Sequence, residues 1–139
     1  MINTILVEDD LYIQKHFAER LKSNEVFRLV GVYRDAFEAE KNCNGSVQLI
    51  LMDEQTQHKH SGLAAAERIK KVFPDIKIVA VTSLVDPEVL SKAKNGAADS
   101  LWYKDHGTEE LLNVIKRTLD GEKVFTSSSP SVEMEKALS

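Results

Sequence analysis

The chain has little of the chemistry that marks secreted or membrane proteins. Its 139 residues contain one cysteine, Cys43, which excludes an internal disulfide framework and favours a reducing compartment. No apolar run approaches the roughly 20 residues that span a bilayer, and the start, MINTILVEDD, lacks the basic and apolar segments of a signal peptide. We therefore expect a cytoplasmic protein without a membrane contact.

Positive charge is also scarce. Lys and Arg number 18 against 22 Asp and Glu, a formal net charge of −4. Contacts to nucleic-acid phosphates need a basic face, so this domain itself is not expected to bind DNA or RNA. Apolar residues make up 42% and charged residues 29% of the chain, as in ordinary soluble proteins, and the length suits one domain with a full core.

Strand-like and helix-like segments alternate along the chain. Five short apolar segments are predicted to be strands: 2–7, 25–33, 47–52, 76–81 and 100–104. The segments between and after them have apolar residues at helical spacing: 10–23, 35–45, 62–73, 86–96 and 108–121. Helical connections imply parallel strands with right-handed crossovers. The pattern therefore predicts an α/β fold, an open, doubly wound five-stranded parallel sheet with helices on both faces.

Capping residues mark several of the predicted helix ends. Asp35 is a predicted N-cap, and so is Asp86, which Pro87 follows at the first helical position. Thr108 is the predicted cap of the last helix, and Gly45 the predicted stop of the second. We expect the folded domain to cover residues 1–122. Residues 123–139, with the stretch TSSSPS, are expected to form a linker or tail.

Reactive polar groups follow four of the five predicted strands. They are Glu8, Asp9 and Asp10 after the first, Asp53 after the third, Thr82 and Ser83 after the fourth, and Lys104 and Asp105 after the fifth. Open parallel sheets bind ligands at the carboxyl ends of their strands. These groups are therefore expected to gather on one rim of the sheet.

This combination of groups suits phosphoryl transfer. Clustered carboxylates repel one another and call for a cation, and hard oxygen ligands suit Mg²⁺. Asp10 is expected to cap a helix, which leaves Glu8 and Asp9 for the metal. A carboxylate can accept a phosphoryl group covalently, while a lysine and a hydroxyl stabilise the charge on its oxygens. Taken singly, each group is more often a cap, a turn residue or a solvated ion, so the prediction depends on their joint placement.

Other chemistries have weaker support. The sequence has no GxGxxG, GxxxxGK[ST] or GxSxG motif. Gln55 stands where a haloacid-dehalogenase-like phosphatase would carry a second aspartate, although a small hydrolase using Asp53 covalently stays open as an alternative. His58 and His60 in "HKH" could bind a transition metal, but two polar-loop histidines are more often solvated. Cys43 has no histidine nearby and is a poor candidate nucleophile.

Over roughly residues 1–122 the chain resembles the receiver domain of two-component response regulators. "ILVED" resembles the family's first strand with its acidic pair, and "LILMD" the strand that ends at the phosphoacceptor. "VAVTS" resembles the switch strand, and "DSLWYKD" the final strand. The resemblance implies a flavodoxin-like fold with strand order 2-1-3-4-5. It also implies that Asp53 takes a phosphoryl group from a phosphohistidine of a sensor histidine kinase.

The same resemblance implies the roles of the other site residues. The metal would be Mg²⁺, held by Glu8, Asp9, Asp53 and the backbone carbonyl of Gln55. Thr82 and Lys104 would contact the phosphoryl oxygens. Such a domain is a phosphoacceptor signalling domain, not an enzyme in the usual sense, with at most weak self-dephosphorylation. Phosphorylation would bias a surface formed by the last helices and strand, and could favour a homodimer.

The end of the chain resembles one subfamily. Lys104 followed by Asp105, and "GEKVF" before a Ser-rich stretch, are similar to receivers with a LuxR/NarL-type helix-turn-helix output. No output domain is within the sequence, so transcription control and DNA binding are expected of a longer protein. The alternative is a stand-alone receiver or a receiver-like binding module that works without phosphorylation.

The sequence departs from the family pattern in three places. "EQTQHKHSG" lacks the proline that usually follows the acceptor, and Gly62 lies one residue farther out than usual. Leu101 stands where the family has its switch aromatic, with Tyr103 on the same predicted strand face. "GAAD" (96–99) is one residue longer than the common form. None of these departures removes a reacting group.

Overall fold

The computed structural model describes residues 1–104 and 110–125, and its centre is a five-stranded sheet. All strand pairs are parallel, in the order β2-β1-β3-β4-β5. The strands are β1 (Ile2–Val7), β2 (Phe27–Tyr33), β3 (Leu49–Asp53), β4 (Lys77–Thr82) and β5 (Ser100–Tyr103). The predicted fold class and strand order are confirmed, and Asp53 is the last residue of its strand.

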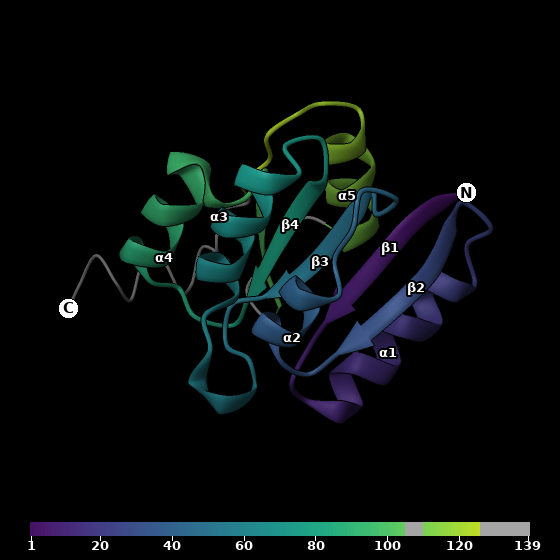
Figure 1. Cartoon of the computed structure of the whole chain (residues 1–139), viewed down its shortest axis with the longest axis horizontal. Helices are drawn as coiled ribbons and strands as arrows, with labels where there is room; N and C mark the ends of the chain where they lie inside the picture. Colours follow the sequence, from purple (N-terminus) through teal and green to yellow (C-terminus); the bar gives the residue numbers. More distant parts are fainter. Residues whose placement is uncertain (105–109, 126–139) are drawn as a thin grey trace.

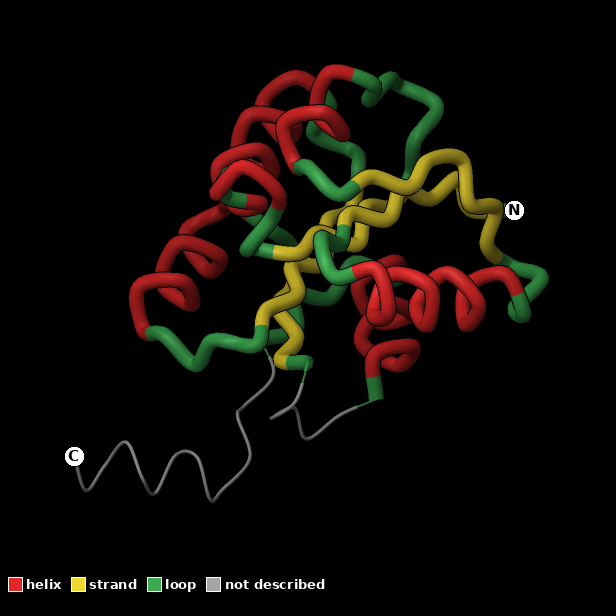
Figure 2. The backbone as a smooth tube through the Cα atoms, turned by 90° about the horizontal axis from the view of Figure 1, so that it is seen from below, coloured by secondary structure: helices red, strands yellow, loops and turns green. Residues whose placement is uncertain are grey.

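Helices cover both faces of this sheet (Figures 1 and 2). They are α1 (Leu11–Lys22), α2 (Ala36–Lys41), α3 (Gly62–Val72), α4 (Pro87–Lys92) and α5 (Leu111–Leu119). Helices α2, α3 and α4 pack on one face, and α1 and α5 on the other. Of the helices in residues 1–104 and 110–125, none is both long and apolar enough to cross a membrane.

The central strands are apolar on both sides because each side has its own core. In β3, Ile50 and Met52 pack toward α2 and α3, while Leu49 and Leu51 pack toward α1 and α5. All four side chains are buried. Such strands read as continuous apolar runs, which is why the pattern predicts a parallel sheet.

Three aspartates cap helices as predicted. The Asp10 carboxylate accepts hydrogen bonds from the backbone N–H groups of Tyr12 and Ile13 at the start of α1. Asp35 does the same for α2, and Asp86 for α4, with Pro87 at the first helical position. The predicted cap Thr108 lies outside the described residues.

The predicted stop of the second helix is wrong. Helix α2 ends at Lys41, before Gly45, with Asn42 at the C-cap. The Asn42 side-chain amide donates to the Glu38 carbonyl, 2.9 Å away. The backbone N–H groups of Asn42 and Cys43 donate to carbonyls three residues back, at 3.2 and 3.3 Å, so the helix ends in a tightened last turn.

The fourth predicted helix, 86–96, is also shorter than expected. Helix α4 ends at Lys92 and a π-helical turn, η2 (Ala93–Ala97), follows it. Gly96 in this turn has a φ of 109°, a conformation that other residues rarely adopt. A π-helical turn accommodates one residue more than an α-helical turn, which fits the longer 96–99 connection.

Candidate functional site

The carboxyl ends of three strands bring two carboxylates and one ammonium group together. Lys104, after β5, places its Nζ 2.6 Å from Glu8 Oε1 and 3.3 Å from Asp53 Oδ1. Glu8 follows β1, and Asp53 ends β3. Both carboxylate residues are almost completely buried, with exposed fractions of 1% and 4%. The structure therefore brings these three side chains into contact, as predicted.

One ammonium group cannot neutralise two buried carboxylates equally. Burial, with the neighbouring Glu8 carboxylate, raises the pKa of Asp53 to about 8, although Lys104 opposes the shift. Burial works to lower the pKa of Lys104, but its bonds and charge interactions with Glu8 and Asp53 raise it overall. Lys104 therefore stays an ammonium ion, and the Asp53 carboxyl group would gain its charged form when a further cation binds nearby.

Asp9 faces a different partner. Its Oδ1 lies 3.2 Å from Arg34 Nη2, and its backbone carbonyl accepts a hydrogen bond from Arg34 Nε. Arg34 follows β2 directly, and sequence reasoning missed it. Arg34 is the residue after the end of β2, so the placement of site residues at strand ends also points to it.

These groups line one cavity of about 270 Å³. Its lining residues are Glu8, Asp9, Asp10, Ile13, Asp53, Gln55, Ser83 and Lys104. The set contains several hard oxygen donors and suits Mg²⁺ in its chemistry. Glu8 Oε1 already lies 2.6 Å from the Lys104 ammonium, so this buried oxygen faces a cation.

Two cations contact the carboxylates of this cavity. Lys104 Nζ contacts Glu8 and Asp53, and Arg34 Nη2 contacts one oxygen of Asp9. In the part of the chain that the structure describes, no three His, Cys, Asp or Glu side chains are arranged to hold a metal ion. A divalent ion bound here would share the carboxylates with Lys104 and Arg34.

Thr82 lies beside the cavity, at the end of β4. It is fully buried, and its Oγ1 accepts a hydrogen bond from the backbone N–H of Leu84 at 3.0 Å. Its neighbour Ser83 lines the cavity. Strand β4 pairs with β3 up to Asp53, which lies opposite Val81, so Thr82 is at the same edge of the sheet as Asp53. The hydrogen bond that its hydroxyl makes here is with the Leu84 N–H.

The "HKH" histidines do not form a metal site. The rings of His58 and His60 are 5.8 Å apart, and His60 Nδ1 lies 2.7 Å from Asp35 Oδ1. His60 therefore has a carboxylate partner that its sequence position did not suggest. His106 lies outside the described residues.

Cys43, Leu101 and Tyr103 all lie away from the site cavity. Burial raises the pKa of the half-buried Cys43 thiol, which disfavours the thiolate that a nucleophile needs. Leu101 and Tyr103 share one strand face, as predicted, and both are buried in the core layer beneath α2, α3 and α4.

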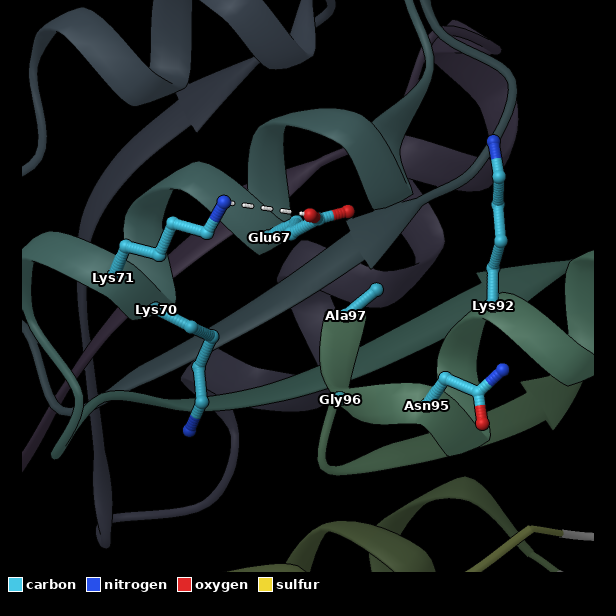
Figure 3. A pocket seen from close by; sticks show the side chains of 7 residues that line it. All are labelled: Glu67, Lys70, Lys71, Lys92, Asn95, Gly96 and Ala97. Carbon is cyan, nitrogen blue, oxygen red and sulfur yellow. Dashed lines mark ion pairs between the residues drawn. The ribbon is translucent and has the colours of Figure 1, made fainter.

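A larger hollow of about 410 Å³ lies between α3 and η2 (Figure 3). Lys70, one of its cations, is 2.9 Å from Asp99 Oδ2, and Lys71 is 3.6 Å from Glu67. Lys70 Nζ also donates to the Ile76 carbonyl, just before β4. The hollow is thus at the amino-terminal edge of the sheet, away from the strand ends that carry Asp53.

Comparison with known proteins gives one family. The family model described as "Response regulator receiver domain" matches residues 4–116. The chain is 27% identical to the response regulator protein VraR of Staphylococcus saprophyticus over 125 residues. It is 26% identical to VraR of Staphylococcus aureus strain Mu3 over the same length. Each alignment covers 89% of this chain and 59% of the relative, so the chain spans about three-fifths of their length.

Solved structures show the same fold. A LuxR-family response regulator from Aurantimonas sp. SI85-9A1 aligns with a TM-score of 0.79 and 20% identity, covering 98% of this chain and 95% of that one. The isolated REC domain of RcsB from Salmonella enterica serovar Typhimurium, with the phosphomimetic BeF3−, aligns at 0.78 and 19%, covering 89% and 92%.

Proposed function

This chain belongs to the response regulator receiver family, and from that premise we propose that Asp53 is its phosphoacceptor. The observation that carries the proposal is the position of Asp53 at the end of β3, in the 270 Å³ cavity and 3.3 Å from Lys104 Nζ. A carboxylate in this position can act as a nucleophile toward phosphorus. The donor would be a phosphohistidine of a sensor histidine kinase.

The reaction exchanges one bond to phosphorus for another. An oxygen of the Asp53 carboxylate attacks phosphorus, and the P–N bond of the phosphohistidine breaks. The products are an aspartyl phosphate on this chain and a free imidazole on the kinase. The high pKa of Asp53 means that its nucleophilic carboxylate form needs a nearby positive charge.

Two residues would stabilise the transferring group. Lys104 can turn its ammonium from Asp53 to a phosphoryl oxygen, which neutralises developing charge. Thr82 can donate its hydroxyl to a phosphoryl oxygen, since its proton is not used in accepting the Leu84 N–H bond. The phosphoryl group would then have one cationic and one neutral donor.

Mg²⁺ would be held by Glu8, Asp9, Asp53 and the backbone carbonyl of Gln55. When bound, it would supply charge neutralisation at the phosphoryl oxygens. Arg34 Nη2 contacts one oxygen of Asp9 and Lys104 Nζ contacts one oxygen of Glu8, so Mg²⁺ would share these carboxylates with the two cations.

A small-molecule phosphodonor tests the assignment. With acetyl phosphate and Mg²⁺, we expect one phosphoryl group on the wild type by intact-mass spectrometry, and none on Asp53→Asn. Asp10→Asn is the matched control, because Asp10 lines the same cavity but caps α1 through its side chain. A phosphoryl group that persists elsewhere in Asp53→Asn would overturn the assignment.

Output would belong to a longer protein. The chain covers 59% of its VraR relatives, and one structural neighbour is described as a DNA-binding, LuxR-family response regulator from Staphylococcus aureus. We therefore place this domain in a cytoplasmic transcription regulator whose DNA contacts lie outside residues 1–122. Phosphorylation would favour a homodimer. Sedimentation with and without beryllofluoride tests this, and an unchanged monomer mass would contradict it.

A further inference from the structure

The loop after Asp53, residues 54–61, is closed by a buried threonine. Thr56 Oγ1 donates to the His60 carbonyl at 2.6 Å and accepts from the backbone N–H of Ala36 at 3.1 Å. Its own N–H donates to the same His60 carbonyl. Because Thr56 is only 5% exposed, these bonds are shielded from water and join the loop to the start of α2.

A second attachment runs through the His60 side chain. Its Nδ1 lies 2.7 Å from Asp35 Oδ1, and its ring stacks on Phe37 with centroids 3.8 Å apart and planes at 11°. The Arg68 guanidinium lies over the same phenyl ring at 4.6 Å. Asp35 is also the N-cap of α2, where its carboxylate accepts the Phe37 N–H, so contacts with both Phe37 and His60 hold this carboxylate in place.

The tip of the loop has a conformation that needs such support. His58 and Lys59 have φ values of 63° and 58°, in the left-handed region. For residues with a Cβ this conformation costs free energy and persists only where surrounding contacts impose it. The contacts through Thr56 and His60 are on either side of this strained pair.

The segment that anchors the loop also contacts the proposed metal site. The Arg34 carbonyl accepts a hydrogen bond from the Gln57 N–H at 2.9 Å, while the Arg34 side chain holds Asp9. Gln55, next to Thr56, lines the site cavity and bridges to Ser61 across the base of the loop. The position of the Gln55 carbonyl therefore depends on how firmly residues 56–60 are held.

We propose that Thr56 and the Asp35–His60 pair are positioning residues, which hold the loop so that the Gln55 carbonyl faces the Mg²⁺ site. This inference rests on the proposed function, since it concerns the same site. The loop has no proline to restrict its backbone, so the hydrogen bonds of the Thr56 and His60 side chains would keep it in one conformation. Outer-shell groups that orient metal ligands commonly change metal affinity by tenfold or more when they are removed.

The test measures Mg²⁺ affinity of the whole chain by isothermal titration calorimetry. Thr56→Val keeps the shape but removes both hydroxyl bonds, and we expect its dissociation constant for Mg²⁺ to rise about tenfold. Thr56→Ser restores the hydroxyl and should restore the affinity. His60→Phe keeps an aromatic ring on Phe37 but loses the Asp35 bond, and we expect the dissociation constant to rise about tenfold here as well.

A matched control lies on the same helix. Glu40→Gln disrupts the Arg68–Glu40 pair on α2 and α3, which contacts Phe37 but none of the loop hydrogen bonds. Its Mg²⁺ affinity should equal that of the wild type. In ¹H–¹⁵N spectra, Mg²⁺ should shift the Gln55 and Thr56 amides in the wild type and in Glu40→Gln, and less in Thr56→Val.

The outcomes separate the inference from the proposed function. If the wild type binds Mg²⁺ and both Thr56→Val and His60→Phe bind it equally well, the positioning role is wrong and the proposed function stands. If the wild type does not bind Mg²⁺ at millimolar concentrations, the proposed metal site is wrong, and this inference falls with it. If Thr56→Val fails to fold, His60→Phe and Asp35→Asn, which keeps a capping side chain, decide by the same criterion.

Discussion

Lys104 Nζ lies 2.6 Å from Glu8 Oε1, an ion pair between the carboxyl ends of the last and first strands. Glu8 is 1% exposed, so its carboxylate has lost nearly all of its contact with water. A buried charge of this kind depends on its partner, because desolvation costs several kcal/mol without compensation. The Glu8–Lys104 pair is therefore the closest charge pair of the site, and Asp53 is a second carboxylate in contact with the same ammonium group.

Removing the Lys104 ammonium should destabilise the fold in a way that a divalent ion corrects. We expect Lys104→Met to lower the free energy of unfolding by about 3 kcal/mol, since it leaves a buried carboxylate uncompensated. Millimolar Mg²⁺ should restore part of this loss, measured by urea denaturation. Lys71→Met is the control, because Lys71 forms an exposed pair with Glu67, and its effect should stay below about 0.5 kcal/mol. Equal losses in both variants would contradict this prediction.

Gly62 lies against the backbone of the acceptor strand. A Cβ at this position would overlap the Asp53 carbonyl oxygen, so one of the two backbones must shift. We expect Gly62→Ala to lower the free energy of unfolding by about 3 kcal/mol and to slow phosphorylation by acetyl phosphate. Gly45→Ala provides the comparison, since nothing lies within 4 Å of its Cβ. It should be neutral or slightly stabilising, and a similar loss at both positions would disprove the steric explanation.

The Lys70–Asp99 pair should matter for stability and not for phosphorylation. Its atoms are 2.9 Å apart, both side chains are largely buried, and Asp99 also accepts the Ile78 N–H. We expect Lys70→Met to cost about 3 kcal/mol. Asp99→Asn keeps an acceptor for Ile78, so a double-mutant cycle of the two changes isolates the ion pair. Acetyl phosphate labelling of the folded variants should be unchanged, and a coupling energy near zero would count against the pair.

Acid should weaken the attachment of the loop at Asp35. Burial works to raise the pKa of Asp35, but the His60 and Phe37 hydrogen bonds and the nearby imidazoles lower it overall. The unfolded chain then binds the proton more tightly than the folded one. The contribution to stability is present above the unfolded pKa of about 3.9 and is lost as the pH falls through the lower folded value.

The measurement is the pH dependence of the free energy of unfolding between pH 5 and the acid limit of folding. Asp35→Asn should flatten the slope by at most about 1.4 kcal/mol per pH unit, the value for one proton. Asp86→Asn makes the same chemical change at the N-cap of α4 and controls for the change of capping residue. An unaltered slope in Asp35→Asn would show that its carboxylate is not held as the structure has it.

Much of the fold follows from sequence periodicity. Each strand begins and ends within two residues of its prediction. The central strands are apolar runs buried on both faces, which have few alternatives, while the half-exposed β2 begins two residues later than predicted. Helix ends were less predictable. Helix α2 ends in a tightened turn with i→i−3 hydrogen bonds, and α4 is followed by a π-helical turn. Neither feature leaves a pattern in apolar spacing.

The site was predictable to the extent that it follows from topology. Glu8, Asp53 and Lys104 meet because parallel strands place their carboxyl ends on one edge. The partners of Asp9 and His60 come from the end of β2 and the connection to α2, and depend on loop conformation instead. The spacing of the histidines in "HKH" does not predict the contact of His60 with Asp35, which is 25 positions away in the sequence.

The contact between Gly62 and Asp53 also links the acceptor mechanically to the rest of the domain. Helix α3 begins at this contact and runs for 11 residues, roughly 16 Å, toward the opposite edge of the sheet. Lys70, in its last turn, donates a hydrogen bond to Asp99, the residue just before β5. One helix therefore contacts the acceptor strand at its first residue and the residue before β5 through its last turn. Any change in the tilt of α3 would alter both contacts together, which makes α3 the element whose position reports on both edges of the sheet.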